Sequence, residues 1–321
     1  MRLVIESRPS NGRLLNGIGH DAAVWQPSRS HRSVITSDTL IEGRHFTREA
    51  MNLRDAGWRA MASNLSDLAA MSARPVLATV ALSVPREIAI EDIVDLYEGM
   101  LDVAGAARCA LAGGDTTRSD ILSITIAAVG EARPTHVKGR AGARPGDVAA
   151  VTGELGASRA GLFASRASAA LEPQLQDEAL RAHRRPVPRL EEGRWLGASS
   201  YVRAVMDLSD GISTDLARMC AMSSCGAAID AAEVPVAGSA AAIAESMGED
   251  PVAFALAGGE DFELLAAIEP RAFAHLASRF RKRFGRPLYA IGRFTEGSGL
   301  RLRKGRTEQP LAPTGYDHFA T

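Results

Sequence analysis

The chain has 321 residues, of which 46% are hydrophobic and 23% are charged, and its formal net charge at pH 7 is −1. These values are typical of soluble globular proteins, and a charge so close to zero argues against binding nucleic acid or an acidic membrane through overall charge. A chain of this length exceeds the size at which a single hydrophobic core usually stops growing, so we expect two domains.

The cysteines and the first residues indicate the cellular compartment of the protein. Cys109, Cys220 and Cys225 are odd in number and have no metal-like spacing, which favours buried thiols in a reducing environment. The first residues include an arginine but no apolar stretch of the kind found in secretory signals, and no apolar run approaches the length of a bilayer-spanning segment. We therefore expect a cytoplasmic protein without a membrane partner.

Hydrophobic patterning predicts alternating strands and helices in the first half of the chain. In chain order we expect strand 33–40, helix 52–71, strand 76–84, helix 90–106, strand 109–112 and strand 121–131. Gly139, Gly142, Pro145 and Gly146 then form a turn-rich stretch. We place the domain boundary there, which gives domains 1–139 and 140–321.

The second half again mixes both element types. We expect strands 147–152, 202–206, 227–230, 262–268 and 288–294, and helices 157–168, 174–183, 190–199 and 271–284. Ile212, Leu216 and Met219 follow one another at spacings of four and three, which predicts one face of a helix that begins just after Asp210 and Gly211. Asp207 and Asp210 should therefore lie at a strand-to-helix turn.

Six aspartates lie in short segments rich in Gly, Ser, Thr or apolar residues: Asp21, Asp38, Asp67, Asp115, Asp207 and Asp210. A single Asp between a strand and a helix is more often a helix cap than a ligand. Six would converge if the strand ends share one edge of a sheet. Because two carboxylates about 4 Å apart repel by roughly 4 kcal/mol at an effective dielectric of about 20, such a cluster needs protonation or bound cations.

Mg²⁺ suits these acids because it is usually held by a few carboxylates together with substrate phosphates. The chain has neither the GxxxxGK[ST] loop nor the signatures of protein kinases. The segment Gly113–Thr117 offers backbone N–H groups and hydroxyls to phosphates instead, with Arg118 or Arg140 as nearby cations. The sequence therefore favours phosphoryl-transfer chemistry.

Seven motifs occur in order from about residue 17 to the end: GIGHDAAV, TSDTLIEGRHF, NLSDLAAM, GGDTTR, DLSDGISTDL, AGGEDFEL and GYDHFA. Together they resemble the thiamine-monophosphate kinase family, of the superfamily that includes aminoimidazole ribonucleotide synthetase. The resemblance implies an α/β (α+β) protein of the aminoimidazole ribonucleotide synthetase-like fold, with a mixed α/β N-terminal domain that binds ATP and Mg²⁺ and forms a homodimer, and a C-terminal α/β domain. It also implies transfer of the ATP γ-phosphate to thiamine monophosphate, giving thiamine diphosphate.

The same resemblance assigns roles by motif. It implies that several Mg²⁺ ions are bound by Asp21, Thr36, Ser37, Asp38, Asp67, Asp115, Asp207 and Asp210. It implies ATP contacts from Gly114, Asp115, Arg140 and Ser209, and substrate contacts from His45, Glu260 and Tyr316. No general base is assigned, because the second pKa of a phosphate monoester is about 6 and the acceptor is already mostly a dianion at neutral pH.

Ordinary structural roles stay open for several of these residues. His45 could be a solvated loop residue, Arg140 a linker charge, Glu260 a cap and Tyr316 a packing residue. Three further acids near the motifs are interpreted as structural or secondary: Glu42, Asp215 and Asp261.

The chain also departs from the family pattern. His20 precedes Asp21 where the family usually has two successive aspartates, Ser72 stands where Gly is usual, and the segment ahead of GIG is short. Our hypothesis is that His20 weakens Mg²⁺ affinity or changes the water network. A divergent paralogue, another ATP-dependent enzyme of the superfamily, and a nucleotide- or thiamine-phosphate-binding protein without turnover are the alternatives.

Overall fold

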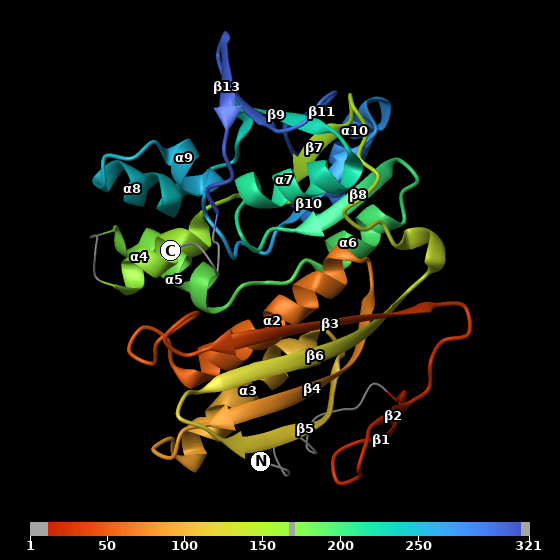
Figure 1. The fold of residues 1–321 in the computed structure, drawn as a ribbon, viewed down its shortest axis with the longest axis vertical. Coiled ribbons are helices and arrows are strands. Elements are labelled where there is room, and N and C mark those ends of the chain that lie inside the picture. The colour runs from red at the N-terminus through yellow and green to blue at the C-terminus, as the bar shows by residue number, and fades with distance from the viewer. Residues whose placement is uncertain (1–11, 167–170, 316–321) are drawn as a thin grey trace. The chain divides into compact units, whose positions relative to one another are not determined.

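The computed structural model describes residues 12–166 and 171–315, which form two compact units (Figure 1). Unit 1 contains the described residues up to Ala69, together with Ala73–Pro134 and Arg184–Leu190. Unit 2 contains Ala70–Ser72, Thr135–His183 and the described residues from Glu191 onward. The boundary expected between residues 139 and 140 lies close to the division after Pro134. The sequence did not predict that Ala70–Ser72 would belong to unit 2 or that Arg184–Leu190 would belong to unit 1.

Unit 1 is built on a four-stranded sheet with the strand order β3-β6-β4-β5. Its strands are β3 (Arg32–Ile41), β6 (Ser123–Ala132), β4 (Arg74–Val84) and β5 (Ala110–Arg118). The β4–β5 pair is parallel and the other two pairs are antiparallel. The predicted strands are confirmed here, although β5 extends well beyond the expected 109–112.

Helices α2 (Leu53–Ala70) and α3 (Ile90–Ala106) lie behind this sheet in the view of Figure 1. They approach each other closely, because a Cβ at Gly57 would lie 1.9 Å from the carbonyl oxygen of Leu96 and one at Gly99 would lie 1.8 Å from that of Arg54. Only glycine permits such backbone contact. The helix expected over 90–106 is confirmed with the same bounds.

The alternation along β3 gives the sheet one covered face and one open face. Leu40 is buried, whereas the side chain of Ile35 is 71% exposed. Because successive side chains of a strand point to opposite faces, Thr36 and Asp38 share the covered face with Leu40, and Ser37 shares the open face with Ile35.

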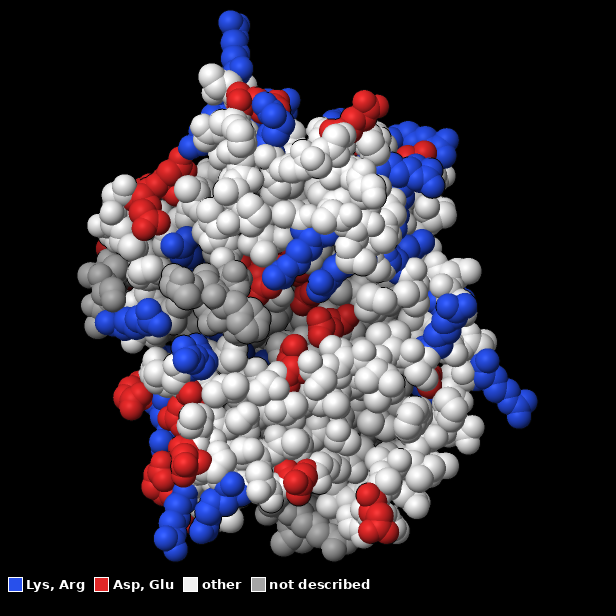
Figure 2. Space-filling view, viewed as in Figure 1, with Lys and Arg blue, Asp and Glu red and all other residues white. Residues whose placement is uncertain are grey.

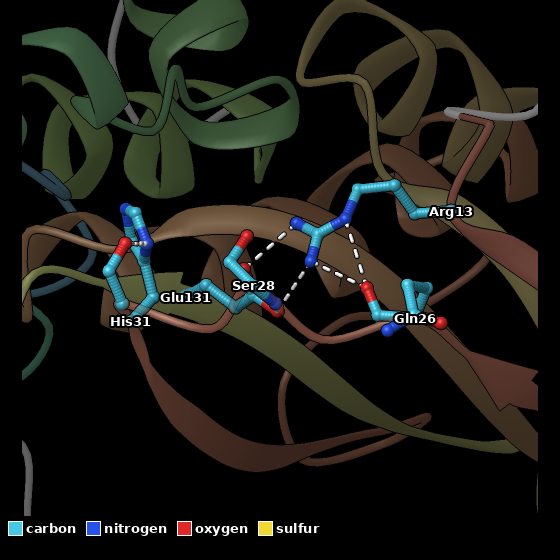
Figure 3. Close-up of polar contacts among 6 residues, drawn as sticks. Arg13, Gln26, Ser28, His31 and Glu131 are labelled. Carbon is cyan, nitrogen blue, oxygen red and sulfur yellow. Dashed lines mark hydrogen bonds and ion pairs between the residues drawn. The ribbon is translucent and has the colours of Figure 1, made fainter.

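A short hairpin precedes the sheet and is attached to it by apolar packing of Leu14 and Trp25 and by an ion pair with a buried carboxylate (Figure 3). The hairpin consists of β1 (Leu14–Asn16) and β2 (Val24–Trp25). Arg13 donates from Nη1 and Nη2 to the two carboxylate oxygens of Glu131, at 2.8 and 2.7 Å, and also from Nη2 to the carbonyl oxygen of Gln26 at 2.7 Å. Burial alone would raise the pKa of Glu131, but the hydrogen bonds from Arg13 and Ser28 lower that pKa to about 2.

We expect Arg13→Met to reduce the free energy of unfolding by about 3 kcal/mol at neutral pH, because it removes one partner of a buried ion pair. The folded-state pKa of Glu131 is about 2, below its ordinary 4.5, so this stabilisation is present above pH 4.5 and is lost as the pH falls towards 2. Urea unfolding at several pH values measures it. Arg29→Met, at an exposed arginine, is the control; a loss that does not shrink in acid would contradict the prediction.

Unit 2 contains a seven-stranded sheet with the order β13-β12-β9-β11-β7-β10-β8, in which only the β12–β9 pair is parallel among the pairs of named strands. Its strands are β7 (Val148–Val151), β8 (Val202–Asp207), β9 (Gly226–Asp230), β10 (Leu264–Ile268), β11 (Tyr289–Thr295), β12 (Leu300–Lys304) and β13 (Thr307–Leu311). Met206, Leu216 and Leu265 belong to its main buried core.

The helices of unit 2 are α4 (Ala157–Ser165), α5 (Pro173–Arg184), α6 (Leu190–Gly197), α7 (Ile212–Ser223), α8 (Gly238–Ser246), α9 (Pro251–Leu256) and α10 (Pro270–Phe284). The sequence analysis missed α8, α9 and the β12–β13 hairpin. Helix α8 is rich in alanine and therefore lacks a clear apolar period, whereas α9 is short but capped by the Asp250 carboxylate, which accepts from the N–H of Val252 at 2.8 Å. Within the described ranges, no helix has both the length and the apolar character needed to span a membrane.

Candidate functional site

The TSD and NLSD motifs of unit 1 meet between β3 and α2. Thr36 donates its hydroxyl proton to the Asp67 carboxylate, and the amide oxygen of Asn64 accepts from the backbone N–H of Asp38 at 3.2 Å. Asn64 is fully buried, and its Nδ2 donates to the carbonyl oxygen of Ala60 at 3.0 Å. The structure thus brings three of the expected metal-binding residues together: Thr36, Asp38 and Asp67.

Ser37 and His45 belong to the same segment but have different surroundings. The Ser37 side chain lies on the open face of the sheet, away from Asp67. His45 follows the strand, and its Nδ1 accepts from the backbone N–H of Ile41 at 3.0 Å. This bond fixes the tautomer with the proton on Nε2 and orients the ring at the end of β3.

The GGDTT segment, which follows the strand predicted over 109–112, lies inside β5. Gly114 pairs with Val80 and Asp115 with Ala81, after a register shift at the start of the strand. Gly114 has φ +149°, and a Cβ there would lie 1.8 Å from the carbonyl oxygen of Val80, so the close approach needs glycine. Pairing with β4 overrides the turn preference of the glycines, and irregular pairing of this kind is common next to functional sites.

Asp115 points away from the α2–β3 group. Thr116, its neighbour, forms a side-chain hydrogen bond with Tyr97 of α3, so Thr116 faces the helices and Asp115 faces the open side. The strands β3 and β5 are opposite edges of the sheet and are separated by three spacings of about 4.8 Å, or about 14 Å. Asp38 and Asp115 therefore belong to separate groups within one chain.

Asp21 follows a segment that lies against β5. It is exposed in the bend that follows GIGH, and a Cβ at Gly17 in the same motif would lie 3.5 Å from the carbonyl oxygen of Ala112 in β5. The donors of unit 1 are thus a β3 group, consisting of Thr36, Asp38 and Asp67, and a β5 group, consisting of Asp21 and Asp115. The expectation that strand ends share one edge does not describe this unit, because TSD and GGDTT lie within strands, NLSD lies in α2 and Asp21 lies in a bend.

In unit 2 the DLSDG and AGGEDFEL motifs form one continuous site. The backbone N–H of Glu260 donates to the carbonyl oxygen of Ser209 at 2.7 Å, and that of Phe262 donates to the carbonyl oxygen of Leu208 at 2.9 Å. Glu260 has φ +63°, a left-handed conformation that costs energy for a residue with a side chain. The pairing of these two loops holds it there, beside Ser209 and Asp210.

Asp207 and Asp210 lie as the sequence predicted, at the end of β8 and ahead of α7. Asp207 is buried. Asp215, interpreted from the sequence as structural, accepts from the backbone N–H groups of Asp210 and Gly211 at 3.0 and 3.1 Å and so ties the turn before α7 to the helix. Arg218 donates to both Asp210 and Asp215. Sequence reasoning missed this arginine, although its i,i+3 spacing from Asp215 was a usable signal.

Arg140, the expected ATP contact, belongs to the same region of unit 2. Burial and the charge of Asp210 raise the pKa of Asp215 to about 6, while the charges of Arg218 and Arg140 oppose this rise. The carbonyl oxygen of Arg140 accepts from the hydroxyl of Ser223 at 3.2 Å, which ties the segment to the end of α7. Arg140 is therefore close to the acids after β8 rather than a remote linker charge.

The chain that leads to Tyr316 is attached beside Asp210. The backbone N–H of Thr314 donates to the hydroxyl of Ser213 at 3.1 Å, and that of Gly315 donates to the hydroxyl of Thr214 at 3.0 Å. A Cβ at Gly315 would lie 2.0 Å from the carbonyl oxygen of Asp210. Tyr316 itself lies outside the described residues.

Models of two domain families match most of the chain. The N-terminal domain of AIR synthase related proteins matches residues 19–132, and the C-terminal domain matches residues 144–305. The chain is 35% identical over 310 residues to the thiamine-monophosphate kinase of Synechococcus elongatus, covering 94% of this chain and 91% of the relative. It is also 35% identical over 313 residues to that of Escherichia coli K12, covering 95% and 92%. The chain belongs to the thiamine-monophosphate kinase family.

Solved structures confirm the fold of this family for the chain. The thiamine-monophosphate kinase of Stenotrophomonas maltophilia K279a has a TM-score of 0.82 at 34% identity, covering 94% of this chain and 93% of that one. AaThiL complexed with AMPPCP and TMP has a TM-score of 0.79 at 28% identity, covering 92% and 89%. E. coli HypE, a hydrogenase maturation protein, matches with a TM-score of 0.80 at 20% identity, which shows a shared fold alone.

The donor chemistry of this family member suits a hard cation. Within residues 12–166 and 171–315, no group of three or more His, Cys, Asp or Glu side chains is arranged to hold a metal ion. The β3 group supplies two carboxylates and a hydroxyl, which are hard oxygen donors. Mg²⁺ keeps several waters and shares its coordination with substrate phosphates, so it does not need a complete protein cage.

Asp261 is a second acid that the sequence analysis left as structural, and it holds the AGGED loop against α4. Its carboxylate accepts from the N–H groups of Gly156 and Ser158, at 2.8 and 3.3 Å. Burial raises the pKa of Asp261 to about 7, against the lowering effect of these two bonds. Because Glu260 is its neighbour, Asp261 positions the expected substrate contact.

We expect Asp261→Asn to change how stability depends on pH. The folded-state pKa of Asp261 is about 7, above its ordinary 3.8, so its contribution is greatest in acid and declines as the pH rises from 3.8 through 7. Asparagine does not titrate, so the thermal midpoint of the variant should rise relative to that of the wild type over this range. Thermal unfolding across the range tests it, and a constant difference between the two proteins would refute it.

Proposed function

We propose that the protein transfers the γ-phosphate of ATP to thiamine monophosphate, giving thiamine diphosphate. The observation that carries this proposal is the family match over nearly the whole chain, together with the joined DLSDG and AGGED loops of unit 2. A relative with the same fold was solved with AMPPCP, an ATP analogue, and TMP. The cytoplasmic location stays a prediction.

The acceptor needs little activation. Its phosphate is mostly a dianion at neutral pH, so the main difficulty is bringing two polyanions into line. Mg²⁺, when bound, would neutralise phosphate charge and help align the reacting groups. The backbone of Gly114 and the guanidinium of Arg140 are the proposed ATP contacts, together with Asp115 and Ser209.

The metal-binding residues proposed from the family motifs are Asp21, Thr36, Ser37, Asp38, Asp67, Asp115, Asp207 and Asp210. The separation of the β3 and β5 groups within unit 1 supports more than one Mg²⁺ ion, because a single ion cannot be ligated by carboxylates about 14 Å apart. Ser37 would supply its hydroxyl from the open face of the sheet, whereas Thr36 and Asp38 lie on the covered face.

The thiamine moiety is a cation, which favours a carboxylate and an aromatic ring as partners. We propose that Glu260 supplies the carboxylate and Tyr316 the ring, a contact worth roughly 0.5–2 kcal/mol. His45, whose ring is oriented by the hydrogen bond from the Ile41 N–H, is the third proposed substrate contact.

Purified protein with ATP, Mg²⁺ and thiamine monophosphate should form ADP and thiamine diphosphate in equal amounts. Asp67→Asn and Asp210→Asn are each expected to lower kcat at least about 100-fold, because each removes a negative charge from a proposed metal site. Asp177→Asn, at an exposed helix position, should leave turnover unchanged. Binding of both ligands without product would instead favour the alternative of a binding protein.

We further propose that the protein forms a homodimer through the open face of unit 1. This face carries the exposed Ile35, and in Figure 2 the front of the sheet is mostly uncharged, with a few acidic side chains. Both edge strands, β3 and β5, lack a second strand partner among the described residues. A second copy would cover apolar surface and unpaired strand edges, which otherwise favour aggregation.

Ile35→Glu should convert the dimer to a monomer, because it places a charge on the open face of the sheet, within the proposed interface. Ile90→Glu is the matched control, since Ile90 is 69% exposed and lies at the start of α3 rather than on the open face. Light scattering with size-exclusion chromatography measures the mass. A monomeric wild type would overturn the proposed interface. An Ile35→Glu variant that is still a dimer would also overturn it.

A further inference from the structure

One guanidinium group contacts two acids at the start of α7. Arg218 Nη1 lies 3.1 Å from the Asp215 carboxylate and closer still to the Asp210 carboxylate. Asp215 has no exposed side-chain surface, whereas the Asp210 side chain is 23% exposed and that of Arg218 is 43% exposed. The arrangement therefore has a fixed, buried member, Asp215, and two members that reach solvent.

The two carboxylates differ in how firmly they are held. Asp215 accepts from the backbone N–H groups of Asp210 and Gly211 as well as from Arg218, so it keeps two hydrogen bonds if the arginine leaves. The Asp210 carboxylate is held by Arg218, and Asp210 is a proposed Mg²⁺ ligand. Arginine stays protonated in proteins, so the only way for it to release Asp210 is to move.

We propose that Arg218 is a built-in counter-cation that occupies Asp210 when no metal is bound and must leave that carboxylate for Mg²⁺ to bind. This inference rests on the proposed function, because it takes Asp210 as a metal ligand. Arg218 is then a positioning residue that sets the Mg²⁺ concentration the protein needs. The exchange replaces one cation with another, so the acids near Asp210 stay neutralised throughout.

The exposure of Arg218 makes this exchange feasible. With 43% of its side chain exposed, the guanidinium can turn into water without burying its charge. Its bond to Asp215 links consecutive turns of α7, so the arginine can keep this contact while it leaves Asp210. Arg140 also lies near Asp215 and supplies a second positive charge to this acid.

The test uses Arg218→Met, which keeps the length of the side chain but removes its charge. Without Mg²⁺, the thermal midpoint should fall below that of the wild type, because Asp210 and Asp215 lose their common partner. With AMPPCP at a fixed concentration, the Mg²⁺ concentration that gives half of the maximal rise in midpoint should fall by at least about threefold, the size expected when an exposed ion pair no longer competes.

Two further variants make the comparison specific. Arg194→Met removes another arginine that forms an i,i+3 ion pair, with Glu191 at 2.7 Å and a side chain 46% exposed, and it should leave the Mg²⁺ requirement unchanged. Arg218→Lys keeps the charge and should require an Mg²⁺ concentration between those of the wild type and Arg218→Met. This variant also covers the case in which Arg218→Met does not fold.

The outcomes separate this inference from the proposed function. If Mg²⁺ stabilises the wild type but Arg218→Met and Arg218→Lys both have the wild-type Mg²⁺ requirement, the inference is overturned and the metal assignment of Asp210 survives. If Mg²⁺ stabilises none of the proteins, the metal assignment fails and the inference fails with it. A turnover assay at saturating Mg²⁺ completes the test, because a counter-cation should affect the Mg²⁺ requirement more than the limiting kcat.

Discussion

Acidic groups with little access to water need a partner that offsets the loss of hydration, and the structure meets this need differently at each site. Glu131 has the guanidinium of Arg13, and its pKa falls to about 2. Asp261 accepts from two backbone N–H groups, and burial raises its pKa to about 7. Asp215 combines both kinds of partner. The ion pair of Glu131 attaches the hairpin to the sheet of unit 1, whereas the partner of Asp210 is the one that we propose is exchanged for Mg²⁺.

Local patterns were sufficient to predict the elements with a clear period. Helix α3 has the expected bounds, and the turn after β8 places Asp207 and Asp210 as expected. The strand predicted over 109–112 was too short, because the glycines of GGDTT continue the pairing with β4 instead of ending it. Local sequence carries no information about that pairing, since the partner strand lies about thirty residues earlier in the chain.

The candidate site shows the same division. The motifs indicated candidate residues, but the two separate groups in unit 1 follow from the strand order, which the sequence did not reveal. Ser72, noted as a departure from the usual Gly, has φ +57°, and its buried hydroxyl has no hydrogen-bond partner among the described residues. This explains why glycine suits the position: it adopts the left-handed conformation without strain and adds no buried hydroxyl.

Helix α7 contacts both residues 314 and 315 and the acid that precedes the helix, Asp210. Ser213 and Thr214 hold those two amides, and Asp215 and Arg218 on the same helix contact Asp210. A shift of α7 would alter both sets of contacts at once. If Asp210 binds Mg²⁺ as proposed, attachment of residues 314 and 315 to α7 and binding at Asp210 are linked equilibria, and each must strengthen or weaken the other by the same factor.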